Sequence, residues 1–304
     1  MTAEEPEVLG EIGRSLLRLS HEGFSGVLRV EGGPGGALWV RDGLVVAATT
    51  PAAPGPESLL LRSGRVSEKD WTDAYTTGAP ADRLAAELAG RGIIGEAALE
   101  AVCLAALFDA VFAMVLSGVE SCAAEPVGPG DRLPLLPVLP GVGHERLARE
   151  TARRMGHTGR WREIGLSMRV RPVPPAVPAP TLLGADRIRR AVLERANGRR
   201  TPRDIAFVLG KGLFAVMSEI ARMVEERVLD LGGPGSTAAE PSVPAPEEDE
   251  DENPATRLPR RRPGTSKINE MPALAGGGRP VPARPLLALR SLPQEAEEVG
   301  PAGE

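Results

Sequence analysis

The sequence predicts an α+β protein in which an N-terminal helix and a small antiparallel β-meander are followed by additional helices. Near the start of the chain apolar residues recur at helical spacing, and three short apolar runs separated by glycine-rich turns come next. The later apolar segments, up to residue 231, have a helical period. Only 3% of the residues are aromatic, so aliphatic side chains must fill the cores.

The first helix is predicted by Val8, Ile12, Leu16 and Leu19, which would share one face. Three strands are predicted over 24–30, 37–40 and 44–48, because these runs have strand composition. The Asp42-Gly43 pair favours a tight turn, since glycine tolerates the positive φ of hairpin turns. Residues 119–125 are a candidate for a further strand of the sheet.

Three helices are predicted after the meander, over residues 67–76, 81–89 and 96–116. Ser67 and Asp70 have the spacing of an N-cap pair. The third helix is strongly apolar, but Glu100 and Asp109 interrupt it, so it is expected to be a buried helix of a soluble protein and not a membrane span. We expect Asp109 on an exposed helix face and assign it no role.

A family resemblance lies in the predicted meander. Residues 25–30 have the sequence SGVLRV, and residues 36–48 have the sequence GALWVRDGLVVAA. This order of a helix, a Gly-x-Leu-x-Val strand, a glycine-bounded hairpin and an x-hydrophobic-x-Ala strand resembles the PATAN-type domain over residues 7–125. The resemblance implies a domain of bacterial signalling proteins that acts through protein contacts and not through catalysis. We therefore expect residues 1–125 to form an interaction domain.

Residues 126–181 are predicted to be a proline-rich linker that carries one short basic helix over 144–155. Prolines recur throughout 126–143 and again in 172–180, where they remove backbone donors and disfavour helix. The second run is expected to be an extended spacer.

Residues 182–231 are predicted to form a small helical domain. Apolar positions at helical spacing mark three short helices, the third with Leu213, Val216, Ile220 and Val224 facing the core. Thr201 to Asp204 is a strong helix start, and 228–231 has the composition of a strand. The stretches GRRTPRDIA at 198–206 and VEERVL at 224–229 resemble the winged helix-turn-helix superfamily, which implies a fold and leaves DNA binding open.

The tail, residues 232–304, is expected to be disordered, because it combines proline, glycine and blocks of like charge without an apolar period. The formal charge is divided along the chain: residues 1–131 carry −10, residues 132–231 carry +9, and the tail carries −4. This division fits two ordinary solvated surfaces of opposite sign, or a basic part that meets either an acidic partner or the acidic part of the chain itself.

The composition favours a cytoplasmic protein without membrane contact. The N-terminus lacks a basic region followed by an apolar one, so no secretory signal is expected. Cys103 and Cys122 share no metal-ligand spacing and fit unpaired thiols in a reducing compartment.

We expect neither an enzyme nor a bound cofactor or metal ion. His21, His144 and His157 occur in different segments without a Cys or carboxylate at zinc-site spacing. The glycine-rich runs at 32–36 and 276–278 lack a P-loop lysine and the dinucleotide-binding fingerprint.

Two functions remain. The first is a regulatory or signalling protein that acts by contacts with another protein, and the alternative is a transcriptional regulator that binds DNA through residues 182–231. In the second case Glu219 and Glu225, on the outer face of the third helix, would oppose sequence reading. The candidate contacts to DNA or to an acidic partner are Arg199, Arg200, Arg203, Lys211 and Arg222.

Overall fold

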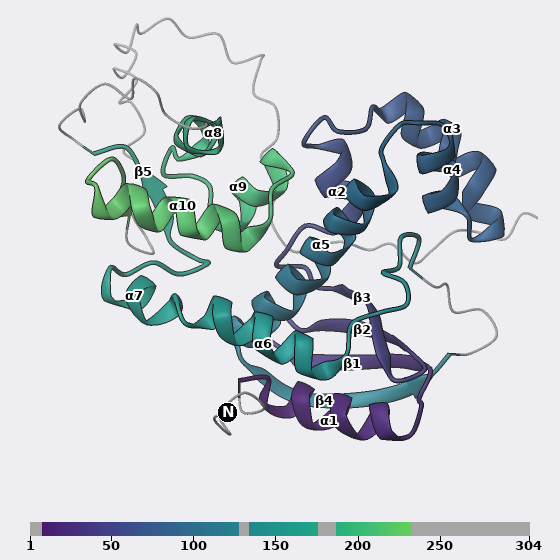
Figure 1. The fold of residues 1–304 in the computed structure, drawn as a ribbon. Helices are drawn as coiled ribbons and strands as arrows, with labels where there is room; N and C mark the ends of the chain where they lie inside the picture. Colours follow the sequence, from purple (N-terminus) through teal and green to yellow (C-terminus); the bar gives the residue numbers. More distant parts are fainter. Residues whose placement is uncertain (1–7, 128–133, 176–186, 233–304) are drawn as a thin grey trace, which may run out of the picture. The chain divides into compact units, whose positions relative to one another are not determined.

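The computed structural model describes residues 8–127, 134–175 and 187–232 (Figure 1). The tail predicted to be disordered lies outside the described residues from 233 onward. The elements, in chain order, are α1 (Gly10–His21), β1 (Gly26–Gly32), β2 (Gly36–Arg41), β3 (Leu44–Thr49), α2 (Pro56–Leu61), α3 (Glu68–Gly78), the short 3-10 helix η1 (Ala79–Ala81), α4 (Leu84–Gly90), α5 (Glu96–Ser117), β4 (Val119–Pro126), α6 (His144–Met155), α7 (Thr158–Glu163), β5 (Arg171–Val173), α8 (Arg187–Arg195), α9 (Pro202–Leu209), α10 (Leu213–Glu225) and β6 (Asp230–Gly232).

The α+β class and the N-terminal helix are confirmed, and the predicted meander is part of a four-stranded antiparallel sheet of order β3-β2-β1-β4. Leu28 of β1 lies opposite Leu38 of β2 and Ala124 of β4. The fourth strand is the candidate at 119–125, which returns to the sheet beside β1 after α5. Asp42 has a φ of 50° and Gly43 a φ of 75°, so both residues of the predicted turn are left-handed.

The first core fills the space between the sheet, α1 and α2–α6. Ile12, Leu16 and Leu19 of α1 are buried, as the apolar spacing predicted, whereas Val8 precedes the helix and is half-buried. The helix packs against β4 and α6. From the strands, Leu28, Leu38 and other aliphatic side chains enter the same core, which contains few aromatic rings.

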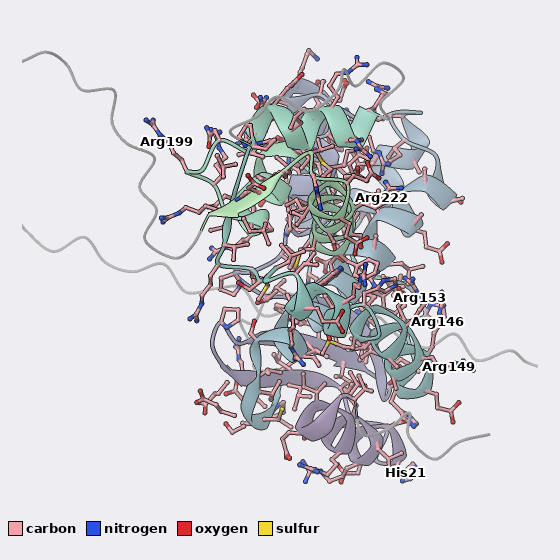
Figure 2. All side chains as sticks on the ribbon, turned by 90° about the vertical axis from the view of Figure 1, so that its left-hand side faces the viewer. His21, Arg146, Arg149, Arg153, Arg199 and Arg222 are labelled. Atoms are coloured by element: carbon pink, nitrogen blue, oxygen red, sulfur yellow. The ribbon has the colours of Figure 1, made fainter. Side chains whose placement is uncertain are left out.

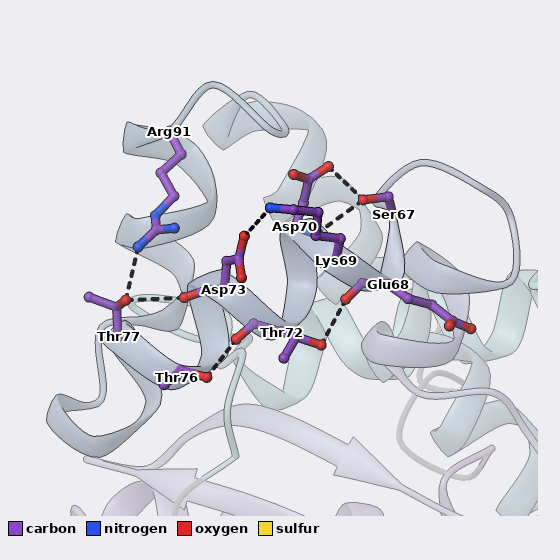
Figure 3. A network of polar contacts seen from close by, with 9 residues as sticks. All are labelled: Ser67, Glu68, Lys69, Asp70, Thr72, Asp73, Thr76, Thr77 and Arg91. Carbon is purple, nitrogen blue, oxygen red and sulfur yellow. Dashed lines mark hydrogen bonds and ion pairs between the residues drawn. The ribbon is translucent and has the colours of Figure 1, made fainter.

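The helix α3 begins at the predicted cap. The Ser67 hydroxyl accepts a hydrogen bond from the Asp70 backbone N–H at 3.1 Å and donates one to the Asp70 carboxylate at 2.7 Å. Further polar contacts, including an ion pair between Lys69 and Asp73, follow the exposed face of the helix (Figure 3). Most of these contacts are local and stabilise α3 itself, while Arg91, which follows α4, donates to the Thr77 hydroxyl at 2.9 Å and links the two helices.

The long helix α5 belongs to two cores at once. Leu107, Val111 and Met114 pack in the first core, whereas Phe112 and Ala113 pack in a second one with the helices of the C-terminal part. Figure 1 shows α5 between α2–α4 and α8–α10. The helix is long and apolar enough to cross a membrane, but 67% of its most apolar window is buried against the other elements. Burial on several sides explains why the sequence shows no polar face there.

Residues 134–143, inside the range predicted as a linker, pack onto the sheet. Leu136, Val138 and Val142 are buried in the first core. The backbones of Val45 and Val142 exchange hydrogen bonds of 3.0 and 2.8 Å. Prolines weaken helices without preventing neighbouring side chains from being buried. The segment thereby leads directly into α6.

The second core joins α8, α9 and α10 to α7 and to the two residues of α5 named above. Leu213, Val216 and Ile220 of α10 are fully buried, as predicted, while Val224 is half-buried. The strand predicted over 228–231 forms two residues later, as β6 (Asp230–Gly232), and pairs antiparallel with β5. Pro172 of β5 belongs to the second proline-rich run, so the described part of that run begins as a strand and not as a spacer.

Candidate functional site

The five predicted contact residues lie on the C-terminal helices, but they do not form one cluster. Arg199 and Arg200 occupy the turn between α8 and α9, Arg203 lies in the first turn of α9, Lys211 lies between α9 and α10, and Arg222 lies near the end of α10. Figure 2 shows Arg199 and Arg222 projecting from different sides of the protein.

The turn before α9 is held by a complete capping box. The Thr201 hydroxyl accepts from the Asp204 N–H at 3.2 Å, and the Asp204 carboxylate accepts from the Thr201 N–H at 3.0 Å. Pro202 stands at the first helical position, where its missing N–H costs nothing. This local order fixes the backbone from which the neighbouring arginines project.

Three arginines make the exposed basic surface of this turn, which we call the arginine turn: Arg199, Arg200 and Arg203. Arg199 and Arg203 are exposed and Arg200 is half-buried. Across the described ranges none of the three forms an ion pair, although Arg203 lies over the Phe207 ring at 5.9 Å. The Gly198 N–H donates to the Pro172 carbonyl at 2.9 Å, which places the turn beside β5.

Arg222 belongs to a different surface, where acidic side chains surround it. It pairs with Glu219, and this hydrogen bond raises the pKa of Arg222. On the same side of the helices Arg189 pairs with Glu226. The cation at Arg222 is therefore largely compensated within the protein.

The expectation that Glu219 lies on the outer face of α10 was wrong. Glu219 is only 3% exposed, and one of its carboxylate oxygens, Oε1, has no hydrogen-bond partner. Glu225, the other acid expected to face DNA, pairs with Arg160 of α7 at 2.7 Å. The sequence pattern did not predict the surroundings of Glu219 and Glu225. The apolar spacing within α10 indicates which face enters the core, but it does not indicate that α7 and α8 cover other parts of the helix.

Asp109 was also expected on an exposed helix face, and this was wrong. It is 3% exposed and pairs with Arg154 of α6. Its carboxylate also accepts hydrogen bonds from the backbone N–H groups of Leu213 and Phe214. Asp109 therefore takes the part of an N-cap side chain for α10, because the N-cap residue Gly212 makes no side-chain cap hydrogen bond.

Several charges balance one another around this carboxylate. Burial raises the pKa of Asp109, while Arg154 and the two backbone N–H groups favour the ionised form and act in the opposite direction. Arg154 also donates to Glu150 at 2.7 Å. Hydrogen bonding to Arg153 is the main reason that the pKa of Glu150 falls to about 2. The junction between α5, α6 and α10 is thus ionic as well as apolar.

Aromatic rings pack around the first turn of α10. The Phe214 ring lies 5.4 Å from Phe112, 5.7 Å from Trp161 and 5.4 Å from His157. The Arg154 guanidinium lies 5.2 Å from the Phe214 ring centre. The start of α10, where a recognition helix would contact base edges, is therefore covered by α5, α6 and α7.

Metal-ligating side chains do not gather in the part of the chain that the structure describes. No three His, Cys, Asp or Glu side chains within it lie close enough to hold a metal ion. Burial raises the pKa of the Cys103 and Cys122 thiols to about 11, so both are protonated at neutral pH.

Comparison of this chain with known protein families, curated proteins and solved structures finds no match.

Proposed function

We propose that this chain is a non-enzymatic, cytoplasmic regulatory protein that acts by binding another protein. In this proposal residues 1–125 are a PATAN-like interaction domain, and residues 182–231 are a winged-helix-like module that presents the arginine turn. Three helices followed by a strand that pairs with β5 support the winged-helix interpretation.

The observation that carries the proposal is the covered start of α10. A winged helix that reads DNA directly inserts the first residues of this helix into the major groove. Here Asp109 accepts hydrogen bonds from the Leu213 and Phe214 N–H groups, and the Phe214 ring is packed among other aromatic rings. The arginine turn, in contrast, is exposed and carries uncompensated charge among the described residues. It fits an acidic protein surface.

Direct DNA binding is the second candidate, and the position of the arginine turn favours it. Arg171 of β5 is exposed, and the hydrogen bond from Gly198 to Pro172 brings its strand beside Arg199. Such a surface would contact phosphates without reading bases, so the affinity would be weak and steeply salt-dependent.

A crosslinking experiment in cells tests the proposal. A photoreactive benzoylphenylalanine replaces the exposed Asn197 in the full chain, and the crosslinked molecules are identified by mass spectrometry. The test variant carries Arg199→Ala, Arg200→Ala and Arg203→Ala. The control variant carries Arg18→Ala, Arg65→Ala and Arg83→Ala, which removes the same charge from exposed arginines elsewhere.

The proposal expects one protein to crosslink to the wild type and the control, and to be lost from the test variant. Fluorescence anisotropy on random and genomic duplexes, at several salt concentrations, is measured in parallel. DNA contact by the turn would reduce the salt slope by about 3 in the test variant, because roughly 0.9 counterions are released per phosphate contact. Tight binding to one duplex, with no protein crosslink, would replace our proposal by direct transcriptional control.

A further inference from the structure

A pocket of about 320 Å³ lies between the β1–β2 turn, the end of α5, α7 and α10. It is lined at one side by Gly33 and at the other by Met217, with the loop that follows α7 closing a third side. Ligand pockets commonly have at least this volume and lie where two packed units meet. The two cores described above meet along α5, next to this pocket.

The floor of the pocket is apolar. Trp161, Leu166 and Met217 are buried and line it, and the half-buried Leu116 and Met168 complete it. A planar or aliphatic body would therefore displace water from apolar surface on binding. Trp161 supplies the largest of these side chains.

The rim of the pocket is basic. Arg162 and Arg169 both line it and are exposed, and neither forms an ion pair with an acidic side chain in 8–127, 134–175 or 187–232. The Ser117 and Thr158 hydroxyls also line it, and each donates to a backbone carbonyl at 2.7 Å. None of the residues that line the described pocket carries a carboxylate.

A second pocket, of about 250 Å³, differs from the first in the charge of the residues that line it. It lies between β3, α2 and α5, is lined by Trp39, Trp71 and Leu107, and has Glu57 as its only charged lining residue among the described ones. An anion would be repelled there. The pocket beside α7, in contrast, combines an apolar floor with two cations that form no ion pair among the described residues.

We propose that the pocket beside α7 binds a small molecule with an apolar, preferably aromatic, body and one anionic group. The guanidinium groups of Arg162 and Arg169 would hold the carboxylate, sulfonate or phosphate by charge-assisted hydrogen bonds, and the body would lie on Trp161, Leu166 and Met217. This ligand site is separate from the arginine turn and does not depend on the protein contacts proposed above.

Two fluorescent probes test the site on the full chain. The anionic probe is 8-anilinonaphthalene-1-sulfonate, and the neutral one is N-phenyl-1-naphthylamine, which has the same body without the charge. Arg162→Ala with Arg169→Ala is the test variant. Arg18→Ala with Arg65→Ala is the control with equal loss of charge, and circular dichroism melts establish that each variant is folded.

The anionic probe should bind the wild type saturably. Its affinity should be at least tenfold weaker for the test variant, because two charged hydrogen bonds are lost, and unchanged for the control. The neutral probe should bind both variants equally. Excitation of tryptophan should produce energy transfer to the anionic probe that is lower in Trp161→Phe, because Trp161 lines the pocket and would lie against the probe.

Failure of the anionic probe to bind the wild type at millimolar concentration would overturn the proposal. Equal affinity for wild type and test variant would also overturn it. Energy transfer that is unchanged in Trp161→Phe would place the probe elsewhere and have the same consequence. Carboxylate- and phosphate-bearing naphthalenes, used as competitors, then show which anion the two arginines prefer.

Discussion

Removal of the Asp109 carboxylate is the perturbation to which the structure should respond most strongly. Asp109→Ala deletes the ion pair with Arg154 and the two hydrogen bonds to the start of α10. Arg154 is 8% exposed, and breaking a buried pair of this kind costs about 3–5 kcal/mol. Loss of an N-cap adds ~1 kcal/mol. Glu150 still contacts Arg154 after the substitution, so the loss from the ion pair is smaller. The expected total loss of unfolding free energy, with the cap included, is therefore about 3–4 kcal/mol.

Urea unfolding followed by far-ultraviolet circular dichroism measures the effect. The second variant, Asp109→Ala with Arg154→Met, removes both charges and is expected to be ~1–3 kcal/mol more stable than Asp109→Ala alone, because no unpaired buried charge remains. Asp73→Ala is the matched control: it breaks an exposed ion pair with Lys69, and the unfolding midpoint should not change measurably.

A loss below about 1 kcal/mol for Asp109→Ala would refute this reasoning, because it would mean that the carboxylate is solvated and α10 lies elsewhere. The same conclusion would follow if the double variant were no more stable than the single one. Hydrogen exchange of the Leu213 and Phe214 amides gives an independent readout, since both should exchange faster in Asp109→Ala.

Three further outcomes are expected. Leu28→Asp should abolish the cooperative thermal transition, because it places a charge at a fully buried position. Leu17→Asp, at a residue that is 41% exposed, should leave the transition in place. Equal melting temperatures for the two variants would contradict the sheet assignment. Gly210→Ala should lower the melting temperature more than Gly64→Ala: both residues have positive φ, but only at Gly210 would the new Cβ lie 2.5 Å from a backbone nitrogen. The pKa of Glu150 is lowered from 4.5 to about 2, so the unfolded state takes up the proton first, and the stability that Glu150 contributes above pH 4.5 should be lost as the pH falls towards 2. Glu150→Gln should show a shallower loss of stability over that interval in acid titrations of unfolding, and an identical slope would show that Glu150 is not held by its arginines.

Local patterns in the chain were sufficient for most elements. The apolar spacing of α1, the Asp42-Gly43 turn, the Ser67 cap and the start of α9 each depend on side chains within a few residues of one another, and all are present as predicted. The backbone from which Arg199, Arg200 and Arg203 project is also fixed locally, by the capping box at the start of α9. Interactions over such short distances are encoded in the order of the residues.

The junction at Asp109 was decided by tertiary structure alone. Its Arg154 partner is 45 residues away in the chain, and the N–H groups that it caps lie about one hundred residues away, beyond any periodic pattern. The burial of Glu219 and the packing of Leu136 and Val142 likewise depend on elements that meet only after folding. The sequence by itself determined most of the helices, strands and turns, since propensity, capping and apolar spacing act locally, whereas α2, α7 and β5 were not predicted. Which charges became buried and paired was determined by the packing of α5, α6 and α10, because desolvation and ion pairing depend on distances in space.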